Sequence, residues 1–135
     1  MTTGTPRVVG VHHVAVWVSD LERARAFYAD ALGGRSGPAY HNPRTGFRSY
    51  FVAFGEGARL ELMSRGDVGP ADRTKIATGY AHVALSVGSE AAVDAMVAAL
   101  EARGNVIESR PRRTGDGYYE AVALDPEGNR IEITA

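Results

Sequence analysis

The stretch His13-Val14-Ala15-Val16-Trp17-Val18 returns, at an offset of 69 residues, as His82-Val83-Ala84-Leu85-Ser86-Val87. A second echo follows each copy, because Arg59-Leu60-Glu61-Leu62 returns as Arg130-Ile131-Glu132-Ile133 at an offset of 71 residues. These spacings are too long for the repeat of a solenoid protein. The sequence therefore predicts one structural module that occurs twice, with a histidine and a glutamate at matched places in each copy.

The bulk composition predicts an ordinary globular protein. The chain has 135 residues, of which 44% are hydrophobic and 23% are charged, and this length suits a single domain. The net charge of −1 argues against a nucleic acid or an anionic membrane as the main partner. There is no cysteine, and no apolar run approaches the ~20 residues of a membrane span. We therefore expect a cytoplasmic protein without disulfides.

The alternation of side chains predicts which way the first strand faces. Residues 8–18 are rich in valine and read as a strand, in which Val14, Val16 and Val18 share one face. His13, Ala15 and Trp17 share the other face, while His12 falls on the valine side. The valine face is the natural core face, so we expect His13 to point away from the core.

The rest of the chain predicts the same order of elements twice. Ser19 and Glu22 fit a capping box at the start of a helix that ends at Gly33-Gly34, and Ser89 caps a second helix that ends at Gly104. Strands are expected at 49–54 and 58–63 in the first copy, and at 80–87, 106–108, 118–124 and 130–134 in the second; residues 110–117 read as a basic loop. The predicted fold class is α+β: a single domain over 1–135, with module one at 8–63, a linker at 64–79 and module two at 80–134.

Four residues are candidates for a metal site. His13, Glu61, His82 and Glu132 all fall on sheet faces that the predicted helices leave uncovered, and imidazole plus carboxylate is a ligand set that divalent metals favour. Taken singly, each histidine is more often a surface residue, and each glutamate follows an arginine by two residues and could form an ion pair. Because the same residue types recur in both modules, we favour the metal interpretation.

Three further residues are candidates for substrate binding. Trp17 shares a face with His13 and either lines a cleft or simply packs. Arg113, with Arg110 and Arg112, and Arg48 lie in basic segments that could hold an anionic group, although a solvated loop is the simpler interpretation. No glycine-rich phosphate loop, dinucleotide fingerprint or nucleophile elbow is present.

These motifs resemble the vicinal oxygen chelate superfamily, which includes glyoxalase I, extradiol dioxygenases and bleomycin resistance proteins. The resemblance rests on His-Val-Ala-Val-Trp-Val-Ser-Asp-Leu-Glu, Leu-Glu-Leu, His-Val-Ala-Leu-Ser-Val and Asp-Pro-Glu-Gly-Asn-Arg-Ile-Glu-Ile, and it covers residues 8–134. It implies two tandem βαβββ modules whose curved mixed sheets surround a metal-binding cleft. It also implies a homodimer, since each of two chains can supply two of the ligands.

The order His, Glu, His, Glu is most similar to that of glyoxalase I. The resemblance implies that His13, Glu61, His82 and Glu132 bind a divalent ion, with Ni²⁺ or Zn²⁺ preferred and Co²⁺, Mn²⁺ or Fe²⁺ as alternatives. It implies a lyase or isomerase of the lactoylglutathione lyase type, acting through an enediolate on a small substrate with vicinal oxygens. Glu132 is the first choice for the catalytic base, with Glu61 on the opposite side of the metal.

The sequence departs from that pattern at one place and leaves two other functions open. Bacterial glyoxalase I usually has an arginine four residues after the first ligand, where it helps to hold the carboxylate of glutathione, and here that position is Trp17. One alternative is a resistance-type protein that sequesters a small aromatic molecule, with Trp17, Phe47 and the tyrosines in its cleft. The other is an Fe-dependent dioxygenase, for which one of the two glutamates would be dispensable.

Overall fold

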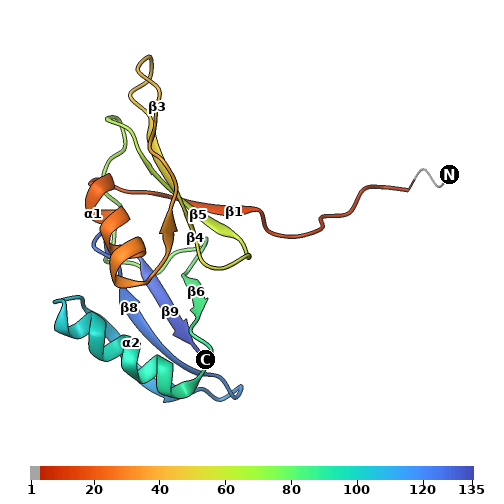
Figure 1. Ribbon diagram of the computed structural model, residues 1–135, viewed down its shortest axis with the longest axis vertical. Coiled ribbons are helices and arrows are strands. Elements are labelled where there is room, and N and C mark those ends of the chain that lie inside the picture. Colours follow the sequence, from red (N-terminus) through yellow and green to blue (C-terminus); the bar gives the residue numbers. More distant parts are fainter. Residues whose placement is uncertain (1–3) are drawn as a thin grey trace.

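The computed structural model describes residues 4–135 as two β-sheets, each covered on one side by one helical segment (Figure 1). The first sheet has the strand order β1-β5-β4-β2, with β3 paired to β4. Its elements are β1 (His13–Trp17), α1 (Leu21–Ala26), the π-helical segment η1 (Phe27–Ala31), β2 (Arg35–Ser36), β3 (Tyr40–His41), β4 (Arg48–Ala53) and β5 (Arg59–Ser64). The predicted α+β class is confirmed by this arrangement.

The second sheet repeats the plan of the first, with the order β6-β9-β8-β7. Its elements are β6 (Val83–Ser86), α2 (Glu90–Ala102), β7 (Ile107–Arg113), β8 (Tyr119–Leu124) and β9 (Arg130–Thr134). In both sheets the first strand runs parallel to the last, as β1 does to β5 and β6 does to β9, and the other pairs are antiparallel. Both sheets are therefore mixed, as the sequence predicts.

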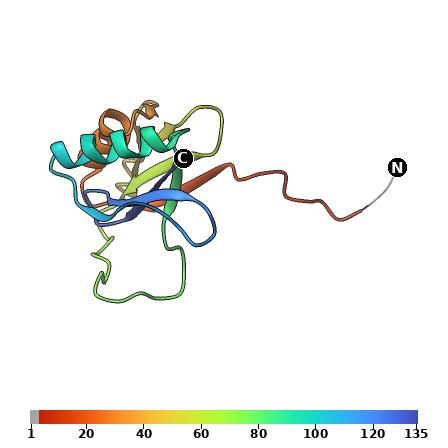
Figure 2. The ribbon, with the colours of Figure 1, turned by 90° about the horizontal axis from the view of Figure 1, so that it is seen from below.

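The period of two along the strands sorts the core from the open face. Leu60 and Leu62 of β5, and Ile131 and Ile133 of β9, are at most 5% exposed and belong to the hydrophobic core. The helices close these faces with Tyr28 and Leu100, among other buried residues. The residues that alternate with them point to the other side of each sheet, which no helix covers. Figure 2 shows that both helices lie on the same side of the two sheets.

The first helix begins one residue later than the capping-box pattern predicts. Asp20 is the N-cap, and its side chain accepts a hydrogen bond from the Arg23 N–H. Ser19 instead donates to the carboxylate of Glu127, with its N–H at 2.8 Å and its hydroxyl at 2.9 Å. Glu22 accepts from the Tyr50 hydroxyl at 2.5 Å rather than reaching back to the cap. The prediction of Ser19 as N-cap was wrong, because the N–H and the hydroxyl of Ser19 bind the distant carboxylate of Glu127 instead.

Several strand boundaries also differ from the prediction; β6, for example, begins at Val83 and not at residue 80. The first strand begins at His13, and residues 8–12 are an exposed, extended segment that projects from the sheet (Figure 1). The first half of the predicted basic loop 110–117 is strand, because β7 runs from Ile107 to Arg113. Since β7 is at the edge of its sheet, a proline there removes no hydrogen bond between central strands.

The turn between β8 and β9 joins the two modules by polar contacts. Asp125 is only 4% exposed, and it accepts hydrogen bonds from the N–H groups of Glu127 and Asn129. It also accepts one from the hydroxyl of Tyr28, at 2.6 Å, which belongs to the other module. With Ser19 bound to Glu127, module two therefore supplies hydrogen-bond acceptors just before α1 and within η1.

The segment between the modules is exposed. It contains no helix or strand from Arg65 to His82, and Figure 2 shows it looping on the side away from the helices. One contact, from the Arg73 guanidinium to the Asn129 side chain at 2.9 Å, ties it to the turn between β8 and β9. Within residues 4–135, no helix has the length and apolar character that crossing a membrane requires.

Candidate metal centre

The first candidate ligands lie on neighbouring strands of the open face. His13 begins β1 and Glu61 is in the middle of β5, and Nε2 of His13 is 3.4 Å from a carboxylate oxygen of Glu61. The histidine side chain is 37% exposed and the glutamate side chain 17% exposed. In the parallel pairing of β1 with β5, His13 is opposite Arg59 and Glu61 is opposite Ala15, so the two candidates are diagonal neighbours on one face, which the alternation of the sequence predicts. We call them the first pair.

The second candidate ligands repeat this geometry in module two. His82 directly precedes β6 and Glu132 is in β9, and Nε2 of His82 is 3.2 Å from a carboxylate oxygen of Glu132. The histidine is 40% exposed and the glutamate 18% exposed, almost the same values as in the first pair. We call them the second pair. The two modules thus present two half-sites of the same composition and nearly the same shape.

The geometry of each pair suits two adjacent ligands of one metal ion. With metal–ligand bonds of about 2.1 Å, neighbouring donor atoms lie about 3.0 Å apart in an octahedron and about 3.4 Å apart in a tetrahedron. The observed separations of 3.2 and 3.4 Å fall in or at the edge of this range. A simple ion pair within each half-site would give similar distances, so the separations fit a metal without requiring one.

The two pairs do not meet within one chain. Among residues 4–135, no group of three or more histidine, aspartate or glutamate side chains lies close enough to hold one metal ion. Each pair offers two ligands, and both remain accessible to solvent. The two pairs are therefore separate within one chain, and each contains two of the four candidate ligands.

The surroundings of the first pair are aromatic and cationic. The Phe51 ring packs edge-on against the His13 ring, with centroids 5.4 Å apart, and the Arg59 guanidinium lies 4.4 Å from the centroid of Phe51. His12 contacts His13, with their Nδ1 atoms 2.8 Å apart. Neither Phe51 nor Arg59 was singled out from the sequence. The alternation of residues 49–54 could have indicated Phe51, since it shares a face with Ser49 rather than with the core residue Val52.

The surroundings of the second pair are acidic. Glu120 of β8 lies on the same face as Glu132 and diagonal to it in the register of the two strands. The pKa of the Glu120 carboxyl is raised because it shares a hydrogen bond with Glu132, and burial and the charge of Glu132 act in the same direction. Arg112, opposite Glu120 on β7, has a smaller opposing effect on that pKa. Glu120 is a third carboxylate beside a candidate ligand, and the sequence reasoning missed it.

Trp17 belongs to an exposed row of aromatic side chains. It lies on the same face of β1 as His13, and its ring is 6.2 Å from that of Phe47, which in turn is 6.1 Å from Tyr40. Trp17 is 39% exposed and Tyr40 54% exposed, and the Arg65 guanidinium stacks 5.0 Å from the Trp17 ring. The other tyrosines do not join this row; Tyr28, for example, is buried in the core.

The two basic candidates for substrate binding lie away from the His–Glu pairs. Arg48 shares the helix side of β4 with Tyr50, and it lines a hollow together with residues at the start of α1. Arg113 forms an ion pair with Glu90 of α2 at 2.5 Å and donates to the carbonyl of Gly117. Arg113 is therefore engaged in contacts within its own module, and Arg48 lies on the side of the sheet that the helix covers.

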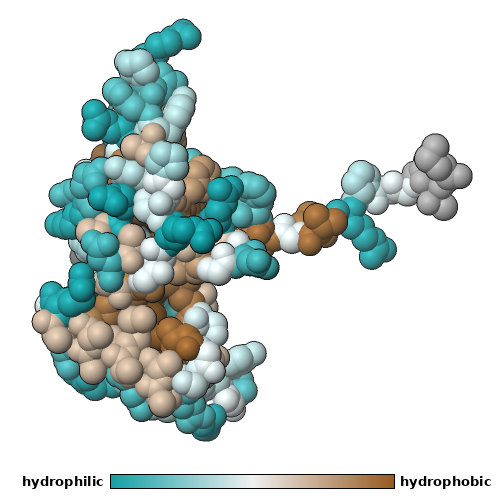
Figure 3. Space-filling model, in the orientation of Figure 1, coloured by the Kyte–Doolittle hydropathy of each residue, from teal (hydrophilic) through white to brown (hydrophobic). Residues whose placement is uncertain are grey.

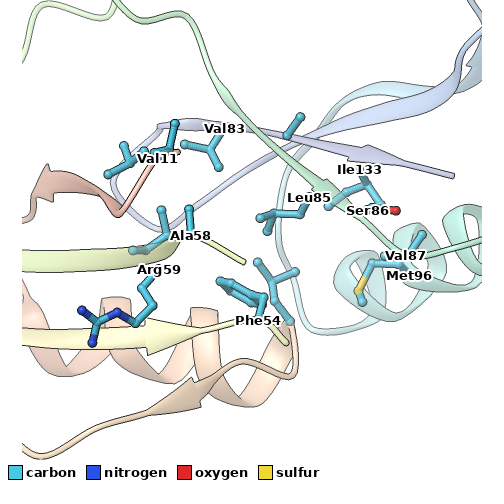
Figure 4. A pocket seen from close by; sticks show the side chains of 14 residues that line it. Val11, Phe54, Ala58, Arg59, Val83, Leu85, Ser86, Val87, Met96 and Ile133 are labelled. Atoms are coloured by element: carbon cyan, nitrogen blue, oxygen red, sulfur yellow. The ribbon is translucent and has the colours of Figure 1, made fainter. Parts of the chain in front are cut away.

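An apolar cleft separates the two modules. It has a volume of about 460 Å³ and is lined by side chains from both cores, as the sticks in Figure 4 show. The lining residues include Val14 and Leu60 from module one and Val83, Leu85 and Met96 from module two. In Figure 3, apolar side chains gather in the hollow between the two halves of the molecule. The cores of the two modules therefore leave a shared apolar surface unfilled.

Comparison with known proteins gives consistent results for sequence and structure. Residues 10–133 match the model of the Glyoxalase/Bleomycin resistance protein/Dioxygenase superfamily. The chain is 32% identical to a lactoylglutathione lyase of Escherichia coli O157:H7 over 124 residues, which is 90% of this chain and 88% of the relative. Glyoxalase I of Leishmania major superposes with a TM-score of 0.73 at 25% identity, over 96% of this chain and 86% of that one.

The fold also matches larger proteins. Glyoxalase I of Zea mays has a TM-score of 0.79 at 24% identity, and the match covers 93% of this chain but only 44% of the maize chain. At this identity the similarity concerns the fold alone. The architecture of two small mixed sheets, each with one helical layer, is thus shared with proteins of that group.

Proposed function

Because the chain belongs to the Glyoxalase/Bleomycin resistance protein/Dioxygenase superfamily, we propose that it is a metal-dependent lyase or isomerase of the glyoxalase I type. Its substrate is a small molecule with vicinal oxygens, and the reaction proceeds through an enediolate. The observation that carries the proposal is the presence of two matched His–Glu pairs, each exposed on the open face of its sheet. The relatives named lactoylglutathione lyase support this reaction class.

The proposed working unit is a homodimer. His13 and Glu61 of one subunit would face His82 and Glu132 of the partner subunit, so that each of two sites receives two imidazoles and two carboxylates. This arrangement explains why the two pairs are separate within one chain. The apolar cleft between the modules supports it, because a second subunit would remove that surface from water.

The proposed roles follow from the chemistry of the four side chains. The imidazoles of His13 and His82 and the two carboxylates would hold a divalent ion, for which Ni²⁺ or Zn²⁺ is our first choice. When bound, such an ion polarises the vicinal oxygens of the substrate and lowers the cost of removing the neighbouring proton. Glu132 would accept that proton and return it to the adjacent carbon, which restores the carboxylate, and Glu61 would lie on the opposite side of the metal.

The experiment that tests the proposal combines metal analysis with turnover. The protein is purified without a histidine tag, its metal content is determined, and turnover of methylglyoxal hemithioacetals is measured with and without added Ni²⁺ or Zn²⁺. Hemithioacetals of glutathione and of 2-mercaptoethanol are compared, because Trp17 replaces a residue that helps to bind glutathione in related enzymes. We expect turnover that disappears with a chelator and returns with metal. No metal-dependent turnover of either adduct would reject the proposal.

A mixing experiment tests the shared site separately. One variant carries His13→Ala and Glu61→Gln, and the other carries His82→Ala and Glu132→Gln, so that neither homodimer has a complete site. When the two are mixed and allowed to exchange subunits, each heterodimer regains one intact site. Recovered activity of up to about one quarter of the wild-type value supports ligands from two chains, since half of the dimers are mixed and each has one of two sites. No recovery, despite demonstrated subunit exchange, would contradict them.

A second candidate function rests on the exposed aromatic row. Trp17, Phe47 and Tyr40 form a surface suited to stacking a flat molecule, as in a protein that sequesters an aromatic compound. The sequence has a single tryptophan, so fluorescence reports directly on this surface. Sequestration predicts that an aromatic probe such as 2-naphthol quenches Trp17 with undiminished affinity after chelation and in the Glu61→Gln variant. Affinity that depends on metal would favour the enzyme.

A further inference from the structure

Arg59 and Arg130 occupy equivalent places in the two modules but have different partners. Each stands two residues before the candidate glutamate of its strand. Arg130 forms an ion pair with Glu108, with Nε 2.6 Å from the carboxylate. Within residues 4–135, Arg59 forms no ion pair, and its guanidinium instead lies on the ring of Phe51. One copy of this arginine is therefore neutralised by its own module, and the other is not.

Arg59 lies directly beside the first pair. In the register of β1 with β5 it is the partner of His13, and it is on the same face as Glu61. Phe51 contacts both side chains, since its centroid is 5.4 Å from that of the His13 ring and 4.4 Å from the Arg59 guanidinium carbon. Figure 4 shows the Arg59 guanidinium directed away from the apolar lining of the cleft between the modules. The cation is thus held on the face that carries the candidate ligands.

This geometry leaves the N–H donors of the Arg59 guanidinium available to bind another group. The ring of Phe51 covers one face of the group, while the N–H donors point outward in the plane of the group. An arginine stays charged at any physiological pH, and its planar fork matches the two oxygens of a carboxylate. A half-buried cation that lacks a carboxylate of its own is suited to an anion supplied from outside.

We infer that Arg59 binds an anionic group of the substrate, and that the substrate is a carboxylate that also carries vicinal oxygens. This inference rests on the proposed function, because it places the anion next to the ligands of the first pair. It divides the substrate between two partners: the vicinal oxygens lie at the four-ligand site, and the carboxylate lies on the Arg59 fork. In the substrate, the carboxylate and the vicinal oxygens are close together, because Arg59 and His13 are direct neighbours on two paired strands.

Two unreactive probes with the same vicinal oxygens test the inference. Acetohydroxamate and succinic monohydroxamate both present a hydroxamate, and only the second has a carboxylate. Their binding to the Ni²⁺-loaded or Zn²⁺-loaded protein is measured by calorimetry. We expect the carboxylate to improve the affinity of the wild type about tenfold, as one charge-assisted hydrogen-bonded pair does. We expect Arg59→Met to abolish this preference and Arg59→Lys to retain part of it. Arg130→Met, the matched control, should leave it unchanged.

The outcomes separate this inference from the function beneath it. Equal affinity of the wild type for both hydroxamates would overturn the inference while leaving the metal site intact. An Arg59→Met variant that keeps the preference would overturn it too, as would one whose main effect is dissociation of the dimer, since Arg59 would then serve the interface. If neither hydroxamate binds to metal-loaded protein, the proposed function fails and the inference fails with it. The comparison of the two hydroxamates on the wild-type protein gives a result even if the Arg59 variants do not fold.

Discussion

The first and second His–Glu pairs have nearly the same geometry but different neighbours. Their nitrogen–oxygen separations are 3.4 and 3.2 Å, and their exposures agree within a few per cent. Around the first pair lie an aromatic ring and a guanidinium that forms no ion pair within residues 4–135, whereas the carboxylate of Glu120 lies beside the second pair. A duplicated module has thus kept the ligand types and changed what surrounds them. Under the proposed function, the two pairs would serve the same purpose, and their different neighbours would give the two halves different roles in substrate binding and proton transfer.

The modules also differ in how their helices are held. The helix α2 has 13 residues and is capped by its own Ser89, whose hydroxyl accepts from the Ala92 N–H at 3.1 Å. The helix α1 has only six residues before it widens into a π-helical turn, and the turn between β8 and β9 binds the residue before its N-cap and Tyr28 within η1. Module one supplies its own N-cap, Asp20, but its short helical segment is also held by hydrogen bonds to module two.

The largest expected effect comes from removing one ligand of either pair. His13→Ala and His82→Ala should each lower the affinity for Ni²⁺ or Zn²⁺ by more than 100-fold, since loss of an outer-shell partner alone costs about 10- to 100-fold. Competition with a chromophoric chelator measures both values. The control is His12→Ala, which removes a neighbouring imidazole and should change the affinity far less. A large loss for His82→Ala but none for His13→Ala would show that the second pair holds the metal without the first.

Much of this comparison could be predicted from residues in the sequence. The echo of the strand at 13–18 indicates two modules, and the period of two along each strand places His13 and Glu61 on one open face. The same reasoning places His82 and Glu132 together. Local alternation suffices for the face of each side chain, whereas the pairing of β1 with β5 and of β6 with β9 follows from the module architecture that the resemblance implies.

Contacts between distant segments could not be predicted in the same way. Nothing local to Ser19 indicates that Glu127, 108 residues away, takes its donors and shifts the helix cap to Asp20. Arg48 was expected in a basic segment before the strand at 49–54, whereas β4 begins at Arg48 itself. The full length of β7 was not predicted because it contains Pro111. Proline usually interrupts a strand, and it is tolerated here because β7 is at the edge of its sheet. That the two pairs stay apart within one chain depends on how whole modules pack.

The second effect concerns the hydrogen bond from Tyr28 to Asp125. Tyr28→Phe should lower the free energy of unfolding by about 1–3 kcal/mol, because the buried Asp125 carboxylate loses a donor. The matched control is Tyr119→Phe, which removes a similar bond to Asp94 on the exposed side of module two and should cost less. Urea unfolding followed by circular dichroism measures both. Equal losses would contradict the special dependence of module one on the turn between β8 and β9.

The Tyr28 hydroxyl should also make the stability of the folded state depend on pH in the alkaline range. Burial, followed by the negative charge of Asp125, raises the pKa of Tyr28 above its ordinary value. The folded state therefore keeps this proton at pH values at which an unfolded tyrosine, with a pKa near 10, has lost it. Stability should fall as pH rises above about 10, by about 1.4 kcal/mol per pH unit from this group. Tyr28→Phe should flatten that fall, and an unchanged slope would show that Tyr28 does not cause it.

A smaller effect is expected at the start of α1. Burial works to raise the pKa of Glu127, but hydrogen bonds from Asp20 and Ser19 outweigh it and leave the pKa below its ordinary value. The stabilisation is therefore present above the unfolded pKa, near 4.3, and is lost as pH falls below it. Glu127→Gln should cost about 1 kcal/mol at neutral pH and flatten the acid limb of the stability curve. Ser89→Ala should cost a similar amount at α2 but leave that limb unchanged.

The smallest expected effect concerns the acidic neighbour of the second pair. Glu120→Gln should lower the affinity for Ni²⁺ or Zn²⁺ about two- to fivefold, because a charge a few ångströms from the ion interacts weakly with it where solvent screens both. Glu108→Gln is the matched control: that carboxylate is paired with Arg130, and its removal should leave the affinity unchanged. A loss as large as that of His82→Ala would make Glu120 a ligand. The second pair would then differ from the first in its metal-binding groups as well as in its neighbours.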